Sequence, residues 1–467
     1  MYTHSHESDT YTEQKVYAER VNNLSLEYYG FVPKAKVVTF GCQQNVSDSE
    51  KLKGMLISCG YILTEDETEA DFIIFNTCAV RGHAEDRVYG NIGKVKQLKA
   101  LNPKLIACVC GCMAQQETVA EKIKKSYPYI DIVFGTQVFH RLPEFIYRRM
   151  NGSKRIFELS LKNEDIVEDI PISRDGKIRG WLPIMYGCNN FCTYCIVPYV
   201  RGRERSRDPE KILNEAKEMV AKGYGEITLL GQNVNSYGKG EAHGINFAKL
   251  LRMINDIEGE FKISFMTSHP KDCTEELLNT IKECKKVSRH LHLPFQSGSS
   301  RILKLMNRYY DREKYLKLIE SAKEKIPDLS LTSDVIVGFP GETYEDFKET
   351  LSLVEAVEFT SLFTFIYSPG NNTPAAAMAD PVSREEKGKW FDELLSLQEK
   401  IAEQNTLKQI GKTYRVLCDG EGSENEMLSG KTQNNLTVEF KGSKNLIGKF
   451  VDVKIDSYKN VFLGTLL

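Results

Sequence analysis

The sequence of 467 residues lacks the features that mark several specialised classes of protein. The segment from Met1 to Tyr29 has neither the basic start nor the apolar stretch of a secretory signal peptide. No run of residues approaches the roughly 20 apolar positions that a membrane-spanning helix needs. The formal net charge is only −2, so no general excess of basic residues favours nucleic acid binding. We expect a cytoplasmic protein without membrane association, in which any RNA-binding surface is a local basic patch.

Cysteine stands out in an otherwise ordinary composition, with 12 residues. Because the cytoplasm keeps thiols reduced, clustered cysteines there are more often metal ligands or catalysts than disulfides. The hydrophobic content of 41% and the charged content of 27% are those of a globular protein, and the length predicts two or three domains.

The region from 34 to 152 follows a polar extension over residues 1–33 and alternates β-rich runs with helix-like segments. The β-rich runs are "KVVTFGC", "DFIIFNTC" and "KLIACVCGC". This alternation predicts a small α/β domain with a parallel sheet. In the helix-like segment "SDSEKLKGMLISCG", Ser47 and Glu50 form a capping-box pattern, which marks a helix start.

Each of these three strands ends on a cysteine, namely Cys42, Cys78 and Cys112. The carboxyl ends of parallel strands meet at one edge of a sheet, so we expect the three thiols to converge there as metal ligands. The alternative is that they are small buried strand residues, as free cysteines often are. We assign that second role to Cys108 and Cys110, which alternate with Cys112 and are predicted to share its strand face.

The region from 174 to 405 repeats strand and helix and predicts a partial (βα)6 barrel, whose active site lies at the carboxyl ends of the strands. Its candidate strands are "WLPIMYG", "EITLLGQ", "KISFMTS", "HLHLPFQ", "LTSDVIVGF" and "SLFTFIYS". Polar residues at that edge are candidates for cofactor binding, although each alone could equally be a cap or a loop hydrogen bond. They are Gln232, Asn233, Ser268, Gln296 and Asp334.

The loop after the first barrel strand carries Cys188, Cys192 and Cys195. A structural zinc site normally needs four ligands, and no fourth cysteine or histidine is nearby in the sequence. Three thiolates can hold a four-iron cluster in which one iron remains open for the amino and carboxylate groups of a small molecule. This spacing, in the loop after the first strand of a partial barrel, resembles the radical S-adenosylmethionine (SAM) superfamily.

The resemblance narrows to the radical SAM methylthiotransferase family and extends over nearly the whole chain. The segments "TFGCQQNVSDSE", "NTCAVRGHAEDRVYGNIG", "GCMAQ" and "VPYVRGRERSR" are most similar to its tRNA-2-methylthio-N6-dimethylallyladenosine synthase branch. Gln43, Asn45 and Glu204 weigh most in that choice. The segment "YSPGNNTPAA" departs from the family, which usually has an arginine there.

The resemblance implies two [4Fe-4S] clusters, one bound by the barrel cysteines and an auxiliary one bound by Cys42, Cys78 and Cys112. It implies the addition of a methylthio group at C2 of N6-isopentenyladenosine beside the anticodon of tRNA. One SAM donates the methyl group and the other gives a 5′-deoxyadenosyl radical. We also expect an electron donor such as flavodoxin or ferredoxin, and a monomer.

Three alternatives remain open at this point. A methylthiotransferase that acts on threonylcarbamoyladenosine in tRNA, or on an aspartate of a ribosomal protein, would share every cysteine. A non-catalytic RNA-binding metalloprotein would bind tRNA without cleaving SAM.

The region from 406 to 467 is short and alternating, and it predicts a small antiparallel β-barrel. The segment "LSGKTQNNLTVEF" resembles the core of the TRAM domain, a module associated with RNA. The resemblance makes four basic residues candidates for phosphate contacts, although they could equally be solvated strand faces. They are Lys412, Arg415, Lys431 and Lys444.

Four arginines follow the barrel cysteines within seven residues, at Arg201, Arg203, Arg205 and Arg207. A charge run is usually a solvated loop, but this one adjoins the predicted cluster. We therefore expect all four to lie on one exposed rim and to contact RNA phosphates.

Overall fold

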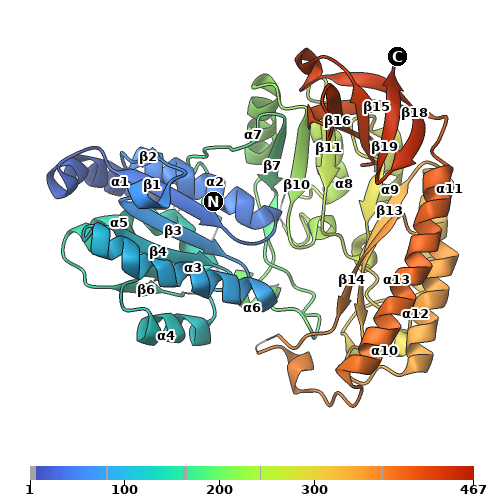
Figure 1. Cartoon of the computed structure of the whole chain (residues 1–467), viewed down its shortest axis with the longest axis horizontal. Helices are drawn as coiled ribbons and strands as arrows, with labels where there is room; N and C mark the ends of the chain where they lie inside the picture. The colour runs from blue at the N-terminus through green and yellow to red at the C-terminus, as the bar shows by residue number, and fades with distance from the viewer. Residues whose placement is uncertain (1–6, 80–81, 161–165, 242, 371) are drawn as a thin grey trace. The chain divides into compact units, whose positions relative to one another are not determined.

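The computed structural model describes residues 7–79, 82–160, 166–241, 243–370 and 372–467 (Figure 1). The chain forms two compact units. The first unit contains residues 1–175, 186–189 and 196–205, and the second contains 176–185, 190–195 and 206–467. Within the described ranges, no helix is both long enough and apolar enough to cross a membrane.

The first unit contains a six-stranded sheet in the order β2-β1-β3-β4-β5-β6, with every neighbouring pair parallel. The parallel α/β prediction is therefore confirmed, and the three predicted strands are β1, β3 and β4. The strands are β1 (Lys34–Thr39), β2 (Ile62–Leu63), β3 (Phe72–Thr77), β4 (Ile106–Gly111), β5 (Ile132–Phe134) and β6 (Ile156–Glu158).

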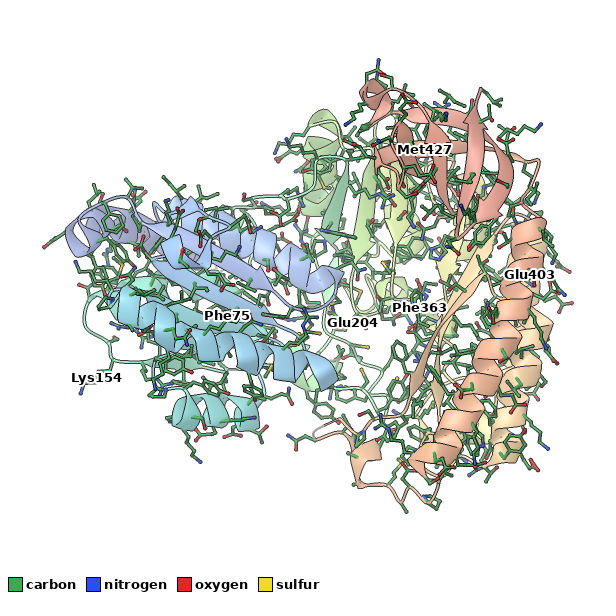
Figure 2. All side chains as sticks on the ribbon, viewed as in Figure 1. Phe75, Lys154, Glu204, Phe363, Glu403 and Met427 are labelled. Carbon is green, nitrogen blue, oxygen red and sulfur yellow. The ribbon has the colours of Figure 1, made fainter. Side chains whose placement is uncertain are left out.

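Helices cover both faces of this sheet because its central strands are apolar on both sides. On β3, Phe72 and Ile74 pack in one core, while Ile73 and Phe75 pack in the other. Figure 2 labels Phe75 on this sheet. Each such buried side chain contributes about 1.5–3 kcal/mol. The first core is closed by α1 (Glu7–Tyr29), α2 (Gln43–Ser58) and α5 (Leu142–Met150), and the second by α3 (Gly82–Leu101) and α4 (Glu117–Ser126).

The start of α2 differs from the sequence prediction. The helix begins at Gln43 with Cys42 as its N-cap, so Ser47 lies inside the helix and the capping box with Glu50 is wrong. The turn that follows β1 leads straight into the helix, and its polar first residues carry no apolar period that would mark the start. Glu50 instead lies 3.5 Å from Arg174 and accepts a hydrogen bond from the backbone of Asp175.

The end of β4 also corrects an expectation. Gly111 has φ +98°, and a Cβ there would lie 2.4 Å from the carbonyl oxygen of Thr77, so the chain leaves the strand at this glycine. Cys112 consequently does not share the face of Cys108 and Cys110. It packs with Ala79, Ile196 and Val200, whereas Cys108 and Cys110 lie in the core beneath α1, α2 and α5.

The second unit contains six parallel barrel strands, as predicted. They form two groups, β11-β10-β7 and β12-β13-β14. Backbone hydrogen bonds between Ile263 and residues 286–288 connect the groups. The strands are β7 (Arg179–Pro183), β10 (Glu226–Leu230), β11 (Lys262–Phe265), β12 (His290–His292), β13 (Ser330–Val337) and β14 (Ser361–Ile366).

Helices follow the barrel strands and pack their apolar faces into one core with them. They are α7 (Pro209–Ala221), α8 (Phe247–Asn255), α9 (Glu275–Glu283), α10 (Ser300–Leu305), α11 (Arg312–Lys325), α12 (Tyr344–Val357) and α13 (Arg384–Leu407). The short β8 (Met185–Tyr186) and β9 (Arg205–Ser206) pair with each other, and α6 (Val197–Arg201) lies between them in sequence.

The carboxy-terminal strands form a closed barrel in the order β15-β16-β17-β19-β18. The predicted small β-barrel is confirmed, although the β17/β19 pair is parallel. Apolar alternation does not mark β16 as a strand, because its centre, Ser429 to Lys431, is polar and contains glycine. The strands are β15 (Thr413–Glu421), β16 (Met427–Thr432), β17 (Thr437–Lys441), β18 (Phe450–Lys459) and β19 (Val461–Leu466).

This small barrel packs on the amino-terminal ends of the large barrel's strands. Lys262, the first residue of β11, donates to the carbonyl of Thr432 at 3.3 Å. Arg179, the first residue of β7, pairs with Asp419. Just before β12, the hydroxyl of Ser288 donates to the carbonyl of Gln433 at 2.6 Å. The attachment is therefore polar and partly buried.

Candidate active site

The three strand-end cysteines of the first unit lie at the point where its strand order reverses. In the order β2-β1-β3-β4-β5, the crossovers change direction between β1 and β3, and ligands of such sheets bind outside the carboxyl ends there. Cys42 follows β1 and Cys78 follows β3. Gly41 has φ +134°, and a Cβ there would lie 2.6 Å from the Cβ of Cys78, so only glycine allows this approach.

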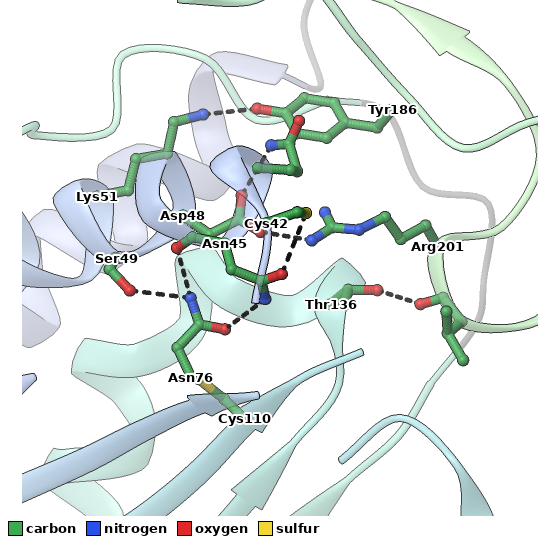
Figure 3. Close-up of polar contacts among 12 residues, drawn as sticks. Cys42, Asn45, Asp48, Ser49, Lys51, Asn76, Cys110, Thr136, Tyr186 and Arg201 are labelled. Atoms are coloured by element: carbon green, nitrogen blue, oxygen red, sulfur yellow. Dashed lines mark hydrogen bonds and ion pairs between the residues drawn. The ribbon is translucent and has the colours of Figure 1, made fainter. Parts of the chain in front are cut away.

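The thiols of these cysteines act on one another electrostatically. The pKa of Cys42 is lowered to about 5, first by a hydrogen bond with Cys78 and further by the charge of Arg201. Burial raises the pKa of Cys112, and the charge of Arg201 opposes that rise. The Cys42 thiol also lies 3.4 Å from Oδ1 of Asn45 (Figure 3). The lowered pKa of Cys42 favours its thiolate, the form that binds metal.

Cys108 and Cys110 are fully buried in an apolar core. Burial raises the pKa of both thiols well above the usual value. This environment agrees with their interpretation as strand residues without a ligand role.

The donor set fits an iron–sulfur cluster. In the described ranges, no three His, Cys, Asp or Glu side chains are close enough to hold a single metal ion. In a zinc site, all thiolate sulfurs bind the same metal ion, each at a Zn–S distance of about 2.3 Å. In a four-iron cluster, each cysteine binds a different iron atom, so the thiolates lie farther apart. Soft sulfur donors suit both zinc and iron–sulfur clusters, so this donor set is compatible with a four-iron cluster.

The barrel cysteines lie in a loop that the structure divides between the two units. In the first unit, Cys188 is buried and its backbone donates to the carbonyl of Gly202 at 3.2 Å. In the second unit, the backbone N–H of Cys195 donates to the carbonyl of Cys192 at 2.9 Å, which closes a turn. Nη1 of Arg308 lies 3.5 Å from Sγ of Cys192.

Two further segments of the second unit hold this loop. Nδ2 of Asn307 donates to the carbonyls of Asn190 and Phe191, at 3.2 and 2.9 Å. The backbone N–H of Ala375 donates to the carbonyl of Thr193 at 2.9 Å. The segment from Tyr367 to Ala376, in which the expected arginine is missing, therefore contacts the cysteine loop through its backbone; residue 371 lies outside the described ranges.

Four of the predicted cofactor-binding residues follow the carboxyl ends of barrel strands, and Asp334 lies inside β13. Two of the five present buried oxygen atoms without a hydrogen-bond partner. They are Oδ1 of Asn233 and Oγ of Ser268. Gln296 has φ +67°, and its backbone bonds with Asp334 and with Ile336. Asp334 lies 3.5 Å from Nε2 of His292. Gln232 is partly buried at the same edge.

The structure adds residues that the sequence analysis missed. Asn235 and Nε2 of His269 are buried at this edge without a partner, and burial, with the charge of Arg308, keeps the pKa of His269 very low and its imidazole neutral. The carboxylate of Glu342 accepts from the backbone of Gly338 and Phe339 after β13, and burial raises its pKa to about 7. The polar segments "QNVN" and "SHP", which follow strands, could have pointed to Asn235 and His269. Nothing in the sequence marked Arg308.

Two aromatic side chains of β14 also escaped notice. Phe363 and Phe365 are 50% and 53% exposed, which is unusual for phenylalanine on a barrel strand. Phe363 is the register partner of Asp334, so both point to the inner face of the sheet. Its ring lies 5.7 Å from that of His292. An apolar surface thus lines the inner face beside the polar strand ends.

The expectation that four arginines share one exposed rim is wrong for two of them. Arg201 is 6% exposed and its Nη2 lies 2.8 Å from Asp48. Arg207 is 5% exposed and pairs with Glu215 at 2.9 Å. Arg203 is exposed and Arg205 is half-buried. The run itself could not separate these roles, because the acidic partners lie outside it: Asp48 on α2, far away in sequence, and Glu215 on the following helix α7.

The candidate RNA contacts of the carboxy-terminal barrel have different surroundings. Lys412 is exposed, beside Gln409. Arg415 is exposed but pairs with Glu260. Lys431 is partly buried, and burial, with the nearby charge of Arg179, lowers its pKa. Lys431 therefore belongs to the attachment between the two barrels rather than to an open surface.

Comparison with known proteins agrees with this geometry. The radical SAM superfamily matches residues 182–354, the uncharacterized protein family UPF0004 matches 34–135 and the TRAM domain matches 407–465. A tRNA-2-methylthio-N6-dimethylallyladenosine synthase of Clostridium tetani is 54% identical over 420 residues, which cover 90% of this chain and 93% of the relative. The chain belongs to the tRNA-2-methylthio-N6-dimethylallyladenosine synthase family. The resemblance found in the sequence is thereby confirmed.

Another member of this family, from Caldicellulosiruptor saccharolyticus, is 50% identical over 445 residues, covering 95% of this chain and 94% of its own. Membership implies SAM and [4Fe-4S] clusters as cofactors. Among solved structures, the radical SAM methyltransferase TsrM of Kitasatospora setae has a TM-score of 0.54 at 13% identity and covers 74% of this chain and 75% of its own. The cobalamin-dependent SAM radical enzyme OxsB has a TM-score of 0.52 at 13% identity and covers 82% and 57%. At such identities the likeness shows the fold alone.

Proposed function

We propose that this protein adds a methylthio group to C2 of N6-isopentenyladenosine beside the anticodon of tRNA. The observation that carries the proposal is a second cysteine site at the switch point of the amino-terminal sheet, in a chain whose barrel has its own three-cysteine loop. One cluster that cleaves SAM needs only the barrel cysteines. A second set of three thiols supports a reaction that also transfers sulfur.

We propose that Cys188, Cys192 and Cys195 hold the cluster that binds SAM, and that Cys42, Cys78 and Cys112 hold the auxiliary cluster. When bound, the first supplies the electron for reductive cleavage of SAM and the second supplies the sulfur site. The first assignment is supported by the sequence spacing and by the hydrogen bonds that hold the loop. The second is supported by the thiol contacts at the sheet edge.

The remaining residues of the barrel edge are proposed to place SAM and the base. The unpartnered oxygens of Asn233 and Ser268 are suited to accept from or donate to the polar groups of SAM, and Gln232, Gln296 and Asp334 line the same edge. The neutral imidazole of His269 can bond without adding charge. No side chain on this inner surface is required to remove a hydrogen from an aromatic carbon, because the cofactor chemistry does that.

The proposed RNA contacts are the basic residues whose side chains are exposed or half-buried. We propose that Arg203, Arg205 and Lys412 contact phosphates, whereas Arg201, Arg207 and Lys431 act inside the protein. Arg415 can contact an RNA phosphate only if its ion pair with Glu260 breaks. The proposal also includes a cytoplasmic location, where tRNA is modified, an external one-electron donor such as flavodoxin or ferredoxin, and a monomeric enzyme.

The test uses tRNA from cells that lack this chain. We expect that the purified, reconstituted protein with SAM and reductant forms the methylthiolated nucleoside in this tRNA, as measured by mass spectrometry of nucleoside digests. The Cys192→Ala variant should form neither this product nor 5′-deoxyadenosine. The Cys273→Ala variant is the matched control, because that buried cysteine lies outside both sites. Product on a ribosomal protein instead of tRNA would refute the proposal.

A further inference from the structure

Each of the two cysteine sites has a buried arginine beside it. The side chain of Arg201 is 6% exposed and acts electrostatically on both Cys42 and Cys112. The residue Arg308 is 8% exposed and its Nη1 lies 3.5 Å from Sγ of Cys192. Arginine is almost never buried without partners, so each guanidinium is held there by specific groups.

The position of Arg201 is fixed from several sides. It is the last residue of α6, a helix of five residues that begins two positions after Cys195. Val200 packs against Cys112, and its carbonyl accepts from the hydroxyl of Thr136 at 2.5 Å. Figure 3 shows the guanidinium beside Asp48, to which it is bonded, and close to Cys42 in the same view. The short helix thus delivers the charge to the auxiliary site.

Asp48 is the second charged member of this arrangement. Its Oδ2 lies 2.8 Å from Nη2 of Arg201, and its Oδ1 accepts from Nε2 of Gln44 at 3.1 Å. The carboxylate is 5% exposed, and its helix α2 begins directly after Cys42. Both charges of the pair are therefore withdrawn from water next to the cysteines, where screening is weak.

Arg308 has a different set of partners. Its Nη2 donates to the carbonyl of Pro294 at 2.7 Å and its Nε to the hydroxyl of Tyr310 at 3.1 Å. Within the described part of the chain, the charged groups that act on it are phenols and a cysteine rather than a carboxylate. The auxiliary site thus faces an ion pair, and Cys192 faces a cation.

We propose that Arg201 and Asp48 are positioning residues that set the reduction potential of the auxiliary cluster with opposite signs, and that Arg308 sets that of the barrel cluster. A nearby positive charge and hydrogen bonds to the sulfurs favour the reduced cluster, and a negative charge disfavours it. The ion pair can thereby keep the two clusters at different potentials. This inference rests on the proposed ligand sets.

The experiment isolates one cluster at a time. A variant with Ala at Cys188, Cys192 and Cys195 retains only the auxiliary site, and its midpoint potential is measured by redox titration with electron paramagnetic resonance. In this background, Asp48→Asn should shift the potential to a less negative value, because it removes the negative charge and leaves the positive charge of Arg201 beside the cluster. Arg201→Lys should shift the potential to a more negative value, because lysine keeps the charge but lacks the paired N–H donors of the guanidinium.

Matched controls separate this effect from general damage. Asp131→Asn removes another buried carboxylate of the first unit, which pairs with Lys99 and Arg149. Asp131 directly precedes β5, so it lies at the amino-terminal edge of the sheet, opposite to the edge with the cysteines. This variant should leave the potential unchanged. The double variant Asp48→Asn with Arg201→Gln removes both charges, and its potential should lie between those of the single variants Asp48→Asn and Arg201→Gln.

A second background, with Ala at Cys42, Cys78 and Cys112, retains only the barrel site. There, Arg308→Lys should make the potential more negative, while Asp48→Asn should have no effect. The inference would be overturned if Asp48→Asn shifted the midpoint potential equally in both backgrounds. It would also be overturned if Asp48→Asn and Arg201→Lys shifted the potential with the same sign, or if Asp131→Asn shifted it. Absence of iron from the auxiliary-only protein would refute the auxiliary site itself, which distinguishes the two failures.

Discussion

Replacing Glu226 by glutamine should destabilise the attachment between the two barrels of the second unit. Glu226 is the first residue of β10, and its side chain is 6% exposed. It lies 3.0 Å from Nε of Arg179 and 3.2 Å from Nζ of Lys262, and it accepts from the hydroxyl of Ser264 at 2.5 Å. The carboxylate therefore pairs with two cations at the amino-terminal ends of the strands.

The magnitude follows from the burial of these cations. Lys262 is 1% exposed, so the Glu226→Gln variant leaves a buried ammonium without its anion. Breaking a buried pair in this way costs about 3–5 kcal/mol. The free energy of unfolding, measured by urea titration of the reconstituted protein, should fall by that amount. The control Glu260→Gln breaks the exposed pair with Arg415 and should change it by less than about 1 kcal/mol.

The pH dependence has a definite sign. Burial raises the pKa of Glu226, but Lys262 and Arg179 outweigh burial, and the net pKa is lowered. Its stabilising contribution is therefore present above the pKa of an unfolded glutamate, about 4.3, and is lost as the pH falls through the folded pKa. Equal losses for Glu226→Gln and Glu260→Gln, or no added acid sensitivity in the wild type relative to Glu226→Gln, would refute this account.

Three further predictions concern the active site. Replacing the three strand-end cysteines by Ala should remove about half of the iron and all methylthiolation while 5′-deoxyadenosine still forms; Cys108→Ala and Cys110→Ala should keep full iron, and lost iron in either would show that the ligands were misassigned. Charge reversal of Arg203 and Arg205 to Glu should weaken tRNA binding and reduce its salt dependence without changing SAM cleavage in the absence of tRNA; an unchanged salt slope would contradict their role. Phe363→Ala should raise the KM for tRNA that carries isopentenyladenosine, with SAM binding unchanged, because it removes exposed apolar surface on the inner face; an unchanged KM would argue against base contact.

Much of the fold was predictable because strand patterns and strand ends are local properties of the sequence. The runs that end on Cys42, Cys78 and Cys112 are β1, β3 and β4, and their meeting at one sheet edge follows from parallel topology. The strand β16 was not predictable from apolar alternation, since its residues are held by closure of the barrel. The start of α2 was misplaced because Cys42 caps the helix without a side-chain hydrogen bond.

The roles of the basic residues could not be predicted in the same way. Arg201 and Arg203 are two positions apart in one basic run, yet the first is buried beside Asp48 and the second is exposed. Asp48 lies on α2, far away in sequence, and nothing in the run itself identifies the partner. Arg308 likewise reaches Cys192 only through the packing of a loop after α10.

The carboxy-terminal barrel is fixed at one end of the large barrel, and the strand-end edge with its cofactor residues is at the other. The strand β13 contains eight residues, so it is about 26 Å long at about 3.3 Å per residue. A strand tilt of about 36° reduces this to a height of about 21 Å. If the small barrel contacts RNA phosphates as proposed, such a phosphate is separated from the modified base by at least that height. An RNA bound at both ends would then need a stem long enough to span this distance.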